Sequence, residues 1–172
     1  PLLAEIPQSD NEADDLVMKN DLSIYAEAFR ILTTNLKFML NKVQGRAPII
    51  LFTSSVKGEG KTTVSINSAL SLSSNKKVIL IGADLRNPQL KRYIPGQKVG
   101  LSDYLADHNI ESTQIIHPSG LNPNLDVIDS GNIPPIPTYL LEDERLKILL
   151  DYLAAKYDYV LIDSAPMMMV SD

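Results

Sequence analysis

Residues 57–63 combine two glycines, two lysines and two threonines at a spacing that suits phosphate binding. Gly58 and Gly60 lack the β-carbons that would keep main-chain N–H groups away from an anion. Lys61 supplies a flexible cation for the outer phosphates of a nucleotide, and the Thr62 hydroxyl stands where such loops place a magnesium ligand. The pattern therefore predicts binding of ATP or ADP together with Mg²⁺.

The full phosphate-loop pattern, Gly-x-x-x-x-Gly-Lys-[Ser/Thr], asks for glycine at a position where this chain has Ser55. The shorter Gly-x-Gly-Lys-[Ser/Thr] arises by chance in a chain of this length in on the order of one sequence in a hundred. The alternative is a glycine-rich turn with a solvated lysine. We expect nucleotide contacts from Lys57, Gly58, Glu59, Gly60, Lys61, Thr62 and Thr63.

Two carboxylates follow apolar runs that predict buried strands. Asp84 comes after a strand predicted over 77–81, and Asp163 ends a strand predicted over 159–163. The carboxyl ends of parallel strands form the edge where open α/β folds bind ligands, so both residues are candidates for the magnesium shell. A cap for the turn before Pro88 is the alternative role of Asp84.

Strands and helices must alternate to position these residues. The sequence predicts an α/β, P-loop NTPase-like, doubly wound and mostly parallel sheet with helices on both faces. The strands are expected over 49–52, 77–81, 125–129 and 159–163, and helices are expected from residue 64 and over 102–106 and 138–156. The rest of 89–124 is predicted as turns, and the proline-rich stretch 130–137 suits neither helix nor central strand.

A long amphipathic helix is predicted before the first strand, with Ser23 as its N-cap and Gly45 just past its end. Its apolar stripe is expected at Ile24, Ala28, Leu32, Leu36, Met39 or Leu40, and Val43. Residues 1–22 are acidic and polar, which predicts a linker or a weakly held arm. One P-loop domain over 23–172 follows, and it is expected to be truncated after the strand that ends in Asp163.

Composition excludes several classes of function. The chain has 172 residues, 44% of them hydrophobic, which suits one domain. Its net charge of −5 argues against a nucleic-acid partner, and the absence of cysteine excludes disulfides and thiolate metal sites. His108 and His117 lie in polar surroundings and are predicted to be surface residues. With no apolar stretch of about 20 residues and no signal peptide, the chain is expected to be soluble.

Four motifs, in this order, resemble those of the bacterial tyrosine kinases. They are Lys-Gly-Glu-Gly-Lys-Thr-Thr at 57–63, Ala-Asp-Leu-Arg-Asn-Pro at 83–88, Ser-Gly-x-x-Pro-Pro-x-Pro at 130–137 and Tyr-Asp-Tyr-Val-Leu-Ile-Asp-Ser-Ala-Pro at 157–166. The resemblance implies an ATP-dependent protein-tyrosine autokinase, the cytoplasmic domain of a bacterial inner-membrane protein that controls capsular or exopolysaccharide synthesis and export. It also implies a ring-like homo-oligomer, a transmembrane activator segment in the same or a partner chain, and a cognate tyrosine phosphatase.

The resemblance also implies roles for individual residues. Lys61, Asp84 and Asp163 are the expected catalytic residues, and Thr62, Asp84 and Asp163 are the expected magnesium ligands. We expect Asp84 to accept the tyrosine proton, with loss of that proton to water as the alternative. Residues 27–36 resemble the family's Glu-x-x-Arg-x-x-Arg helix, which implies self-association through Glu27 and Arg30.

Several positions depart from the family pattern. Thr33 replaces the last arginine of the helix motif, so we expect weak assembly. Gly82 replaces the first aspartate of Asp-x-Asp-x-Arg, which leaves Asp84 as the carboxylate at that strand end. In the proline-rich loop, Ile136 and Tyr139 stand where Asn and Glu are usual.

Two other functions compete with a kinase. Partitioning-type ATPases carry an extra lysine five residues before the phosphate-loop lysine; here that position is Val56, with Lys57 one place off, which disfavours this class. A nucleotide-binding pseudokinase that regulates a membrane partner is the other alternative, and it is supported by Gly82 and Thr33.

Overall fold

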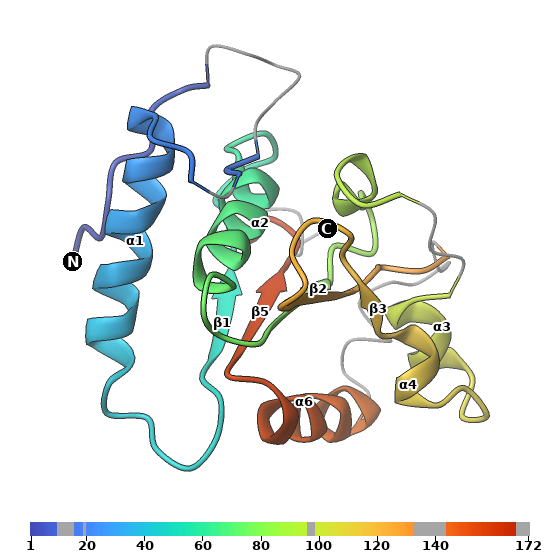
Figure 1. Cartoon of the computed structure of the whole chain (residues 1–172). Coiled ribbons are helices and arrows are strands. Elements are labelled where there is room, and N and C mark those ends of the chain that lie inside the picture. The colour runs from blue at the N-terminus through green and yellow to red at the C-terminus, as the bar shows by residue number, and fades with distance from the viewer. Residues whose placement is uncertain (10–15, 19, 96–98, 133–143, 168–172) are drawn as a thin grey trace.

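The structure is a computed structural model that describes residues 1–9, 16–18, 20–95, 99–132 and 144–167. Its centre is a five-stranded sheet in the order β1-β5-β2-β4-β3 (Figure 1). The strands are β1 (Ile49–Phe52), β2 (Val78–Gly82), β3 (His117–Pro118), β4 (Leu125–Ile128) and β5 (Tyr159–Asp163). All neighbouring pairs are parallel except β3 with β4. The predicted mostly parallel α/β sheet is confirmed.

Helices cover both faces of this sheet. They are α1 (Ile24–Leu40), α2 (Lys61–Leu72), the short 3-10 helix η1 (Leu90–Arg92), α3 (Leu101–Ala106), α4 (Ser112–Ile115) and α6 (Glu144–Lys156). Alternate residues of the fully buried strand β2 point to opposite faces. Val78 and Leu80 pack with α2, and Ile79 and Ile81 pack with α3 and α6.

Helix α1 lies outside the sheet and the helices on its two faces, because it packs on α2 rather than on the sheet (Figure 1). Ser23 is its N-cap as predicted, since its hydroxyl accepts a hydrogen bond from the N–H of Ala26 at 3.1 Å. The predicted apolar stripe is partly wrong. The buried residues of α1 are Ala26, Ala28, Phe29, Leu32 and Thr33, whereas Ile24, Met39 and Val43 are exposed.

Residues 89–124 contain more regular structure than the single helix predicted there. The structure adds η1, α4 and β3 to α3. His117 lies in β3 opposite Val127, half-buried, and its Nε2 is buried without a hydrogen-bond partner among the described residues. The surface prediction is therefore wrong for His117, because a two-residue strand is too short to show an alternating pattern; His108 is exposed as predicted.

The arm and the proline-rich segment are described only in part. The arm contacts the helices at several points: Asn35 Nδ2 donates to the carbonyl of Leu3 at 2.6 Å, the N–H of Val17 donates to Asn67 Oδ1 at 2.7 Å, and Arg30 Nη1 donates to the carbonyl of Asp21 at 2.8 Å. Residues 133–143, which include Ile136, Tyr139 and the predicted start of the last helix, lie outside the described residues. Within the described ranges, no helix has the length and apolar character needed to cross a membrane.

Candidate functional site

The loop between β1 and α2 adopts a backbone that depends on its glycines. Gly58 and Gly60 have φ of +93° and +81°, in the left-handed region that favours glycine. Ser55 does not need to be glycine, since Asn20 is the one non-glycine residue with positive φ in the part of the chain that the structure describes. The departure from the full phosphate-loop pattern is therefore compatible with the loop's conformation.

Glu59 holds this loop together from within. Its Oε2 accepts hydrogen bonds from the N–H groups of Ser55 at 2.8 Å and Val56 at 3.3 Å. Glu59 is absent from the residues that line the adjacent cavity. The structure thus places Glu59 as a brace of the loop, whereas its predicted direct contact with nucleotide stays a prediction.

Lys61, Thr62 and Asp163 meet where α2 begins and β5 ends. Lys61 Nζ donates to Asp163 Oδ1 at 2.8 Å, and Thr62 Oγ1 donates to Asp163 Oδ2 at 2.8 Å. The lysine side chain is only 8% exposed and the aspartate side chain 2%. The first N–H groups of α2 have no acceptor within the helix, so they carry a partial positive charge. This charge lies next to the buried ion pair of Lys61 and Asp163.

Burial dominates the electrostatics of Asp163. Desolvation raises the pKa of its carboxyl, the hydrogen bonds from Lys61 and Thr62 act in the opposite direction, and the negative charge of nearby Asp84 raises it further. A desolvated carboxylate beside a second carboxylate favours the approach of a cation.

Asp84 caps the turn before Pro88 and also borders the cavity, while its role as a magnesium ligand stays a prediction. Its Oδ1 accepts a hydrogen bond from the N–H of Asn87 at 3.0 Å, which caps the turn before Pro88. The residue is 7% exposed and lines the same cavity as the phosphate loop. The turn therefore fixes the orientation of a carboxylate that borders the candidate site.

A cavity of about 300 Å³ lies in front of these residues. It is lined by Ser54, Lys57, Gly58, Gly60, Lys61, Thr62, Thr63, Asp84, Asn87, Gln89, Arg92, Tyr93 and Pro166. Glycine N–H groups, a helix N-terminus and a lysine fit a polyphosphate. No cluster of three or more His, Asp or Glu side chains suited to a metal occurs among the described residues, but Mg²⁺ needs only one or two carboxylates beside phosphate and water ligands.

Sequence reasoning missed one wall of this cavity. Asn87, Gln89, Arg92 and Tyr93 belong to the segment after Asp84, which folds back toward the phosphate loop. The Tyr93 hydroxyl lies 3.0 Å from Thr63 Oγ1. The signal for this wall was the turn that Asp84 and Pro88 form, which reverses the chain immediately after the strand.

Close packing leaves little room for a side chain at position 82. A Cβ at this position would lie 2.9 Å from Ser130 Oγ and 3.3 Å from the Ser130 nitrogen. Residue 130 follows β4, the neighbour of β2 in the sheet. A Cβ at this strand end would therefore crowd the loop after β4.

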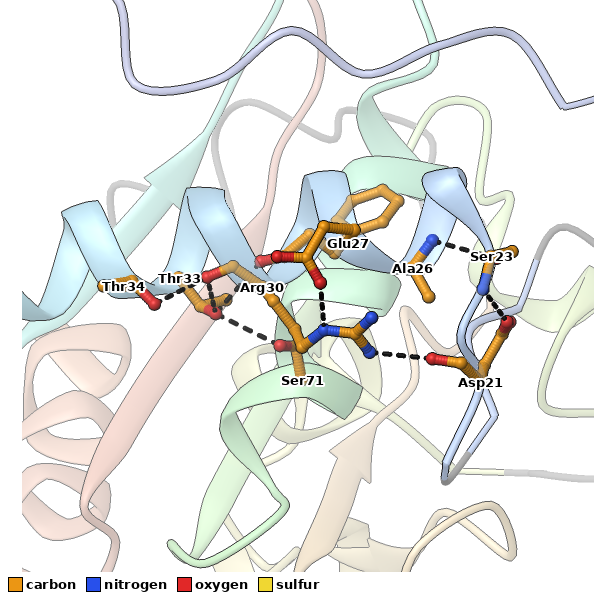
Figure 2. Close-up of polar contacts among 9 residues, drawn as sticks. Asp21, Ser23, Ala26, Glu27, Arg30, Thr33, Thr34 and Ser71 are labelled. Atoms are coloured by element: carbon orange, nitrogen blue, oxygen red, sulfur yellow. Dashed lines mark hydrogen bonds and ion pairs between the residues drawn. The ribbon is translucent and has the colours of Figure 1, made fainter.

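Glu27 and Arg30 lie on α1 (Figure 2), and neither residue lines the cavity. Arg30 Nε donates to Glu27 Oε2 at 2.7 Å, and Arg30 Nη1 donates to the carbonyl of Asp21 at 2.8 Å. Thr33 is only 4% exposed, and its Oγ1 lies 3.1 Å from Ser71 Oγ on α2. Figure 2 shows this contact, which places Thr33 between two helices rather than on the surface that carries Glu27.

Comparison with known proteins identifies the family of this chain. A family model described as an AAA domain matches residues 47–171, which include the phosphate loop, Asp84 and Asp163. The chain belongs to the AAA domain family. Within this AAA domain, the phosphate loop and both carboxylates lie together at the carboxyl edge of the sheet.

Bacterial tyrosine kinases are among the relatives of this AAA domain. Tyrosine-protein kinase Etk of Escherichia coli (strain K12) is 35% identical over 159 residues, which cover 91% of this chain and 21% of Etk. The solved kinase domain of the Escherichia coli tyrosine kinase ETK matches with a TM-score of 0.88 at 32% identity, over 99% of this chain and 70% of that one. The predicted membership of the bacterial tyrosine kinases is confirmed, for a chain that spans about a fifth of Etk.

Partitioning-type ATPases share the fold of this AAA domain less completely. The septum site-determining protein MinD of Pyrococcus horikoshii OT3, solved in complex with Mg-ADP, matches with a TM-score of 0.59 at 26% identity. The match covers 68% of this chain and 48% of the MinD chain. The comparison therefore favours the kinases over the partitioning-type ATPases.

Proposed function

We propose that this chain is the catalytic domain of an ATP-dependent protein-tyrosine autokinase that regulates capsular or exopolysaccharide synthesis and export. The observation that carries the proposal is the buried cluster of Lys61, Thr62 and Asp163 beside the glycine loop, in a chain related to tyrosine kinases. The domain covers residues 23–172, residues 1–22 form an arm, and the whole is the cytoplasmic part of a bacterial inner-membrane protein.

The residues of the phosphate loop bind and orient the nucleotide. N–H groups of residues 58–63 and the ammonium group of Lys61 hold the phosphates, and exposed Lys57 at the cavity wall adds a second cation. Phosphoryl transfer asks the protein mainly for positioning and charge neutralisation, which these groups supply. When bound, Mg²⁺ neutralises charge on the phosphates, and Thr62, Asp84 and Asp163 are the residues that would hold it.

Asp84 is assigned as the acceptor of the tyrosine proton. Its carboxylate borders the cavity and is oriented by the N–H of Asn87, so it is fixed before a substrate binds. With Gly82 beside it, no second carboxylate is available on the end of β2. Loss of the proton to water is the alternative, because a loose transition state needs little help from a base.

Self-association through α1 belongs to the same proposal. Glu27 and Arg30 side chains are 57% and 42% exposed. Ile24, Ile31 and Phe38, spaced seven residues apart, leave an exposed apolar stripe along the helix beside this ion pair. An apolar stripe flanked by charges supports a contact with a second copy, in a ring-like homo-oligomer. A transmembrane activator segment and a cognate tyrosine phosphatase are the further partners that we propose.

The test measures phosphotyrosine after incubation with Mg·ATP labelled on its terminal phosphate. A tyrosine-containing acceptor polypeptide is added, so that the assay does not depend on the chain's own tyrosines. We expect phosphotyrosine from the parent chain. Asp84→Asn should lower the rate about tenfold or more while Mg·ADP still binds, because asparagine keeps the turn hydrogen bond but loses the base. Asp163→Asn should weaken binding as well.

Asp151→Asn is the matched control, since this carboxylate lies on α6, outside the residues that line the cavity, and is half-exposed. If the parent chain hydrolyses ATP but forms no phosphotyrosine, the proposed kinase activity is refuted and the protein is an ATPase. An unchanged rate in Asp84→Asn would refute the role of Asp84 as proton acceptor and leave water in its place.

A further inference from the structure

Tyr93 connects the wall of the cavity to the first turn of α2. Its hydroxyl oxygen lies 3.0 Å from Thr63 Oγ1, although the two residues are 30 positions apart in the sequence. Both residues line the cavity in front of the phosphate loop. None of the motifs recognised in the sequence includes Tyr93.

The backbone that carries Tyr93 is anchored on both sides. Leu90 and Ile94 are 2% and 5% exposed and pack in the apolar cluster under α2. The N–H of Tyr93 donates to the carbonyl of Leu90 at 3.0 Å, and Lys91 Nζ lies 3.7 Å from Asp129 Oδ2 just beyond β4. The Tyr93 hydroxyl therefore reaches Thr63 from a segment that is fixed to the core and to the sheet edge.

A phosphate in the loop fixes the direction of this hydrogen bond. A hydroxyl has one proton to donate and lone pairs with which to accept, whereas a phosphate oxygen at neutral pH only accepts. Thr63 donates to a phosphate only when its proton points into the cavity. Its oxygen is then available to accept the proton of Tyr93, so both hydroxyl protons are used in one chain from Tyr93 through Thr63 to the ligand.

We infer that Tyr93 is a positioning residue of the nucleotide site, which donates to Thr63 and so holds the Thr63 proton toward the nucleotide phosphates. The inference rests on the nucleotide binding proposed above. Successive hydrogen bonds polarise one another, and a fixed donor behind Thr63 removes rotamers in which its proton points elsewhere. Tyr93 thus raises affinity through Thr63, without a contact of its own with the ligand.

The test is a double-mutant cycle on Mg·ADP affinity, measured by calorimetry. Tyr93→Phe keeps the ring and removes the hydroxyl, and Thr63→Val keeps the branched shape and removes the partner hydroxyl. Tyr93→Phe should weaken binding about threefold to tenfold, the range expected for one neutral hydrogen bond. In the Thr63→Val background it should have no further effect, because Tyr93 then has nothing to position.

Two further variants separate positioning from packing. Thr63→Ser keeps a hydroxyl and should keep the sensitivity to Tyr93→Phe. Tyr152→Phe, on the exposed side of α6 and outside the cavity lining, should leave affinity unchanged.

Each contrary outcome is distinct. Parental affinity in Tyr93→Phe would overturn the inference while the proposed nucleotide binding stands. Equal weakening by Tyr93→Phe with and without the Thr63 hydroxyl would also overturn it, since Tyr93 would then act on the ligand or on packing. No binding of Mg·ADP by the parent chain would overturn both the proposed function and this inference.

Discussion

Lys61 Nζ lies 2.8 Å from Asp163 Oδ1, and both side chains are more than nine-tenths buried. The pair joins the first residue of α2 to the last residue of β5. The phosphate loop is therefore braced against the middle of the sheet before any ligand arrives. A nucleotide that attracts Lys61 must share this cation with Asp163.

Replacement of Lys61 by methionine should affect binding and stability separately. We expect Lys61→Met to abolish measurable binding of Mg·ADP, and to lower the free energy of unfolding by about 3–5 kcal/mol because Asp163 keeps a buried charge without its partner. The stability deficit should shrink as the pH falls and Asp163 is protonated. Calorimetry and urea unfolding measure the two effects.

The double variant Lys61→Met/Asp163→Asn is the control for this prediction. It should regain most of the lost stability and none of the binding. Unchanged affinity in Lys61→Met would remove Lys61 from the binding site, and a double variant as unstable as the single one would contradict the unpaired charge as the cause.

Truncation of the ion pair on α1 should reduce self-association. We expect Glu27→Ala/Arg30→Ala, and separately Phe38→Ser on the exposed apolar stripe, to lower the mass measured by light scattering. Thr33→Val should leave the mass unchanged, because Thr33 faces α2. Parental mass in both surface variants would show that this face is only solvated surface. Thr33→Arg should not strengthen assembly, since it would bury a charge between α1 and α2.

A side chain at position 82 should destabilise the protein. We expect Gly82→Ala to lower the free energy of unfolding by about 1–3 kcal/mol, the range for overpacking, because its Cβ would lie 2.9 Å from Ser130 Oγ. Ser130→Ala should relieve this loss in the double variant. Alone it should be close to neutral, since Ser130 Oγ is buried with no hydrogen-bond partner in the described structure. Parental stability of Gly82→Ala in urea would disprove the packing argument.

Alkaline pH should destabilise the fold through Tyr157. Its hydroxyl donates to Asp126 Oδ2 at 2.5 Å, and burial, followed by Asp126, raises the pKa of this phenol well above its usual value. The stability that this group contributes is fully present below the unfolded pKa of about 10, and it is lost as the pH rises toward the folded pKa. The free energy of unfolding should therefore fall as the pH rises above about 10, and fall less in Tyr157→Phe. An equal fall in both proteins would assign the alkaline loss to other groups.

The sequence predicted those parts of the fold that depend on local patterns. The continuous apolar run of β2 and the strand, glycine loop and helix around Lys61 are encoded by consecutive residues. The buried face of α1 was mispredicted because apolar residues occur on both sides of this helix, as exposed Ile24 and Phe38 show. Periodicity reveals an apolar stripe but does not identify the stripe that packs against α2.

Only the part of the candidate site that is built from local sequence motifs could be predicted. Lys61, Asp84 and Asp163 come together because motifs at strand ends converge at one edge of a parallel sheet. Tyr93 reaches Thr63 only because the chain after Asp84 reverses and packs Leu90 into the core. The contact between Tyr93 and Thr63 depends on the path of the intervening turn, so no fixed spacing in the sequence predicts it.

The position of β5 in the sheet has a consequence for how the protein folds. This strand is inserted between β1 and β2, and its neighbour Ser164 bonds the carbonyl of Phe52, 112 residues earlier. Pairings between such distant residues slow folding, because a long loop must close before they form. During synthesis, β1 and β2 leave the ribosome long before the strand that separates them. A nascent chain that lacks β5 therefore exposes two apolar strand edges, and its phosphate loop acquires Asp163 only when β5 enters the sheet.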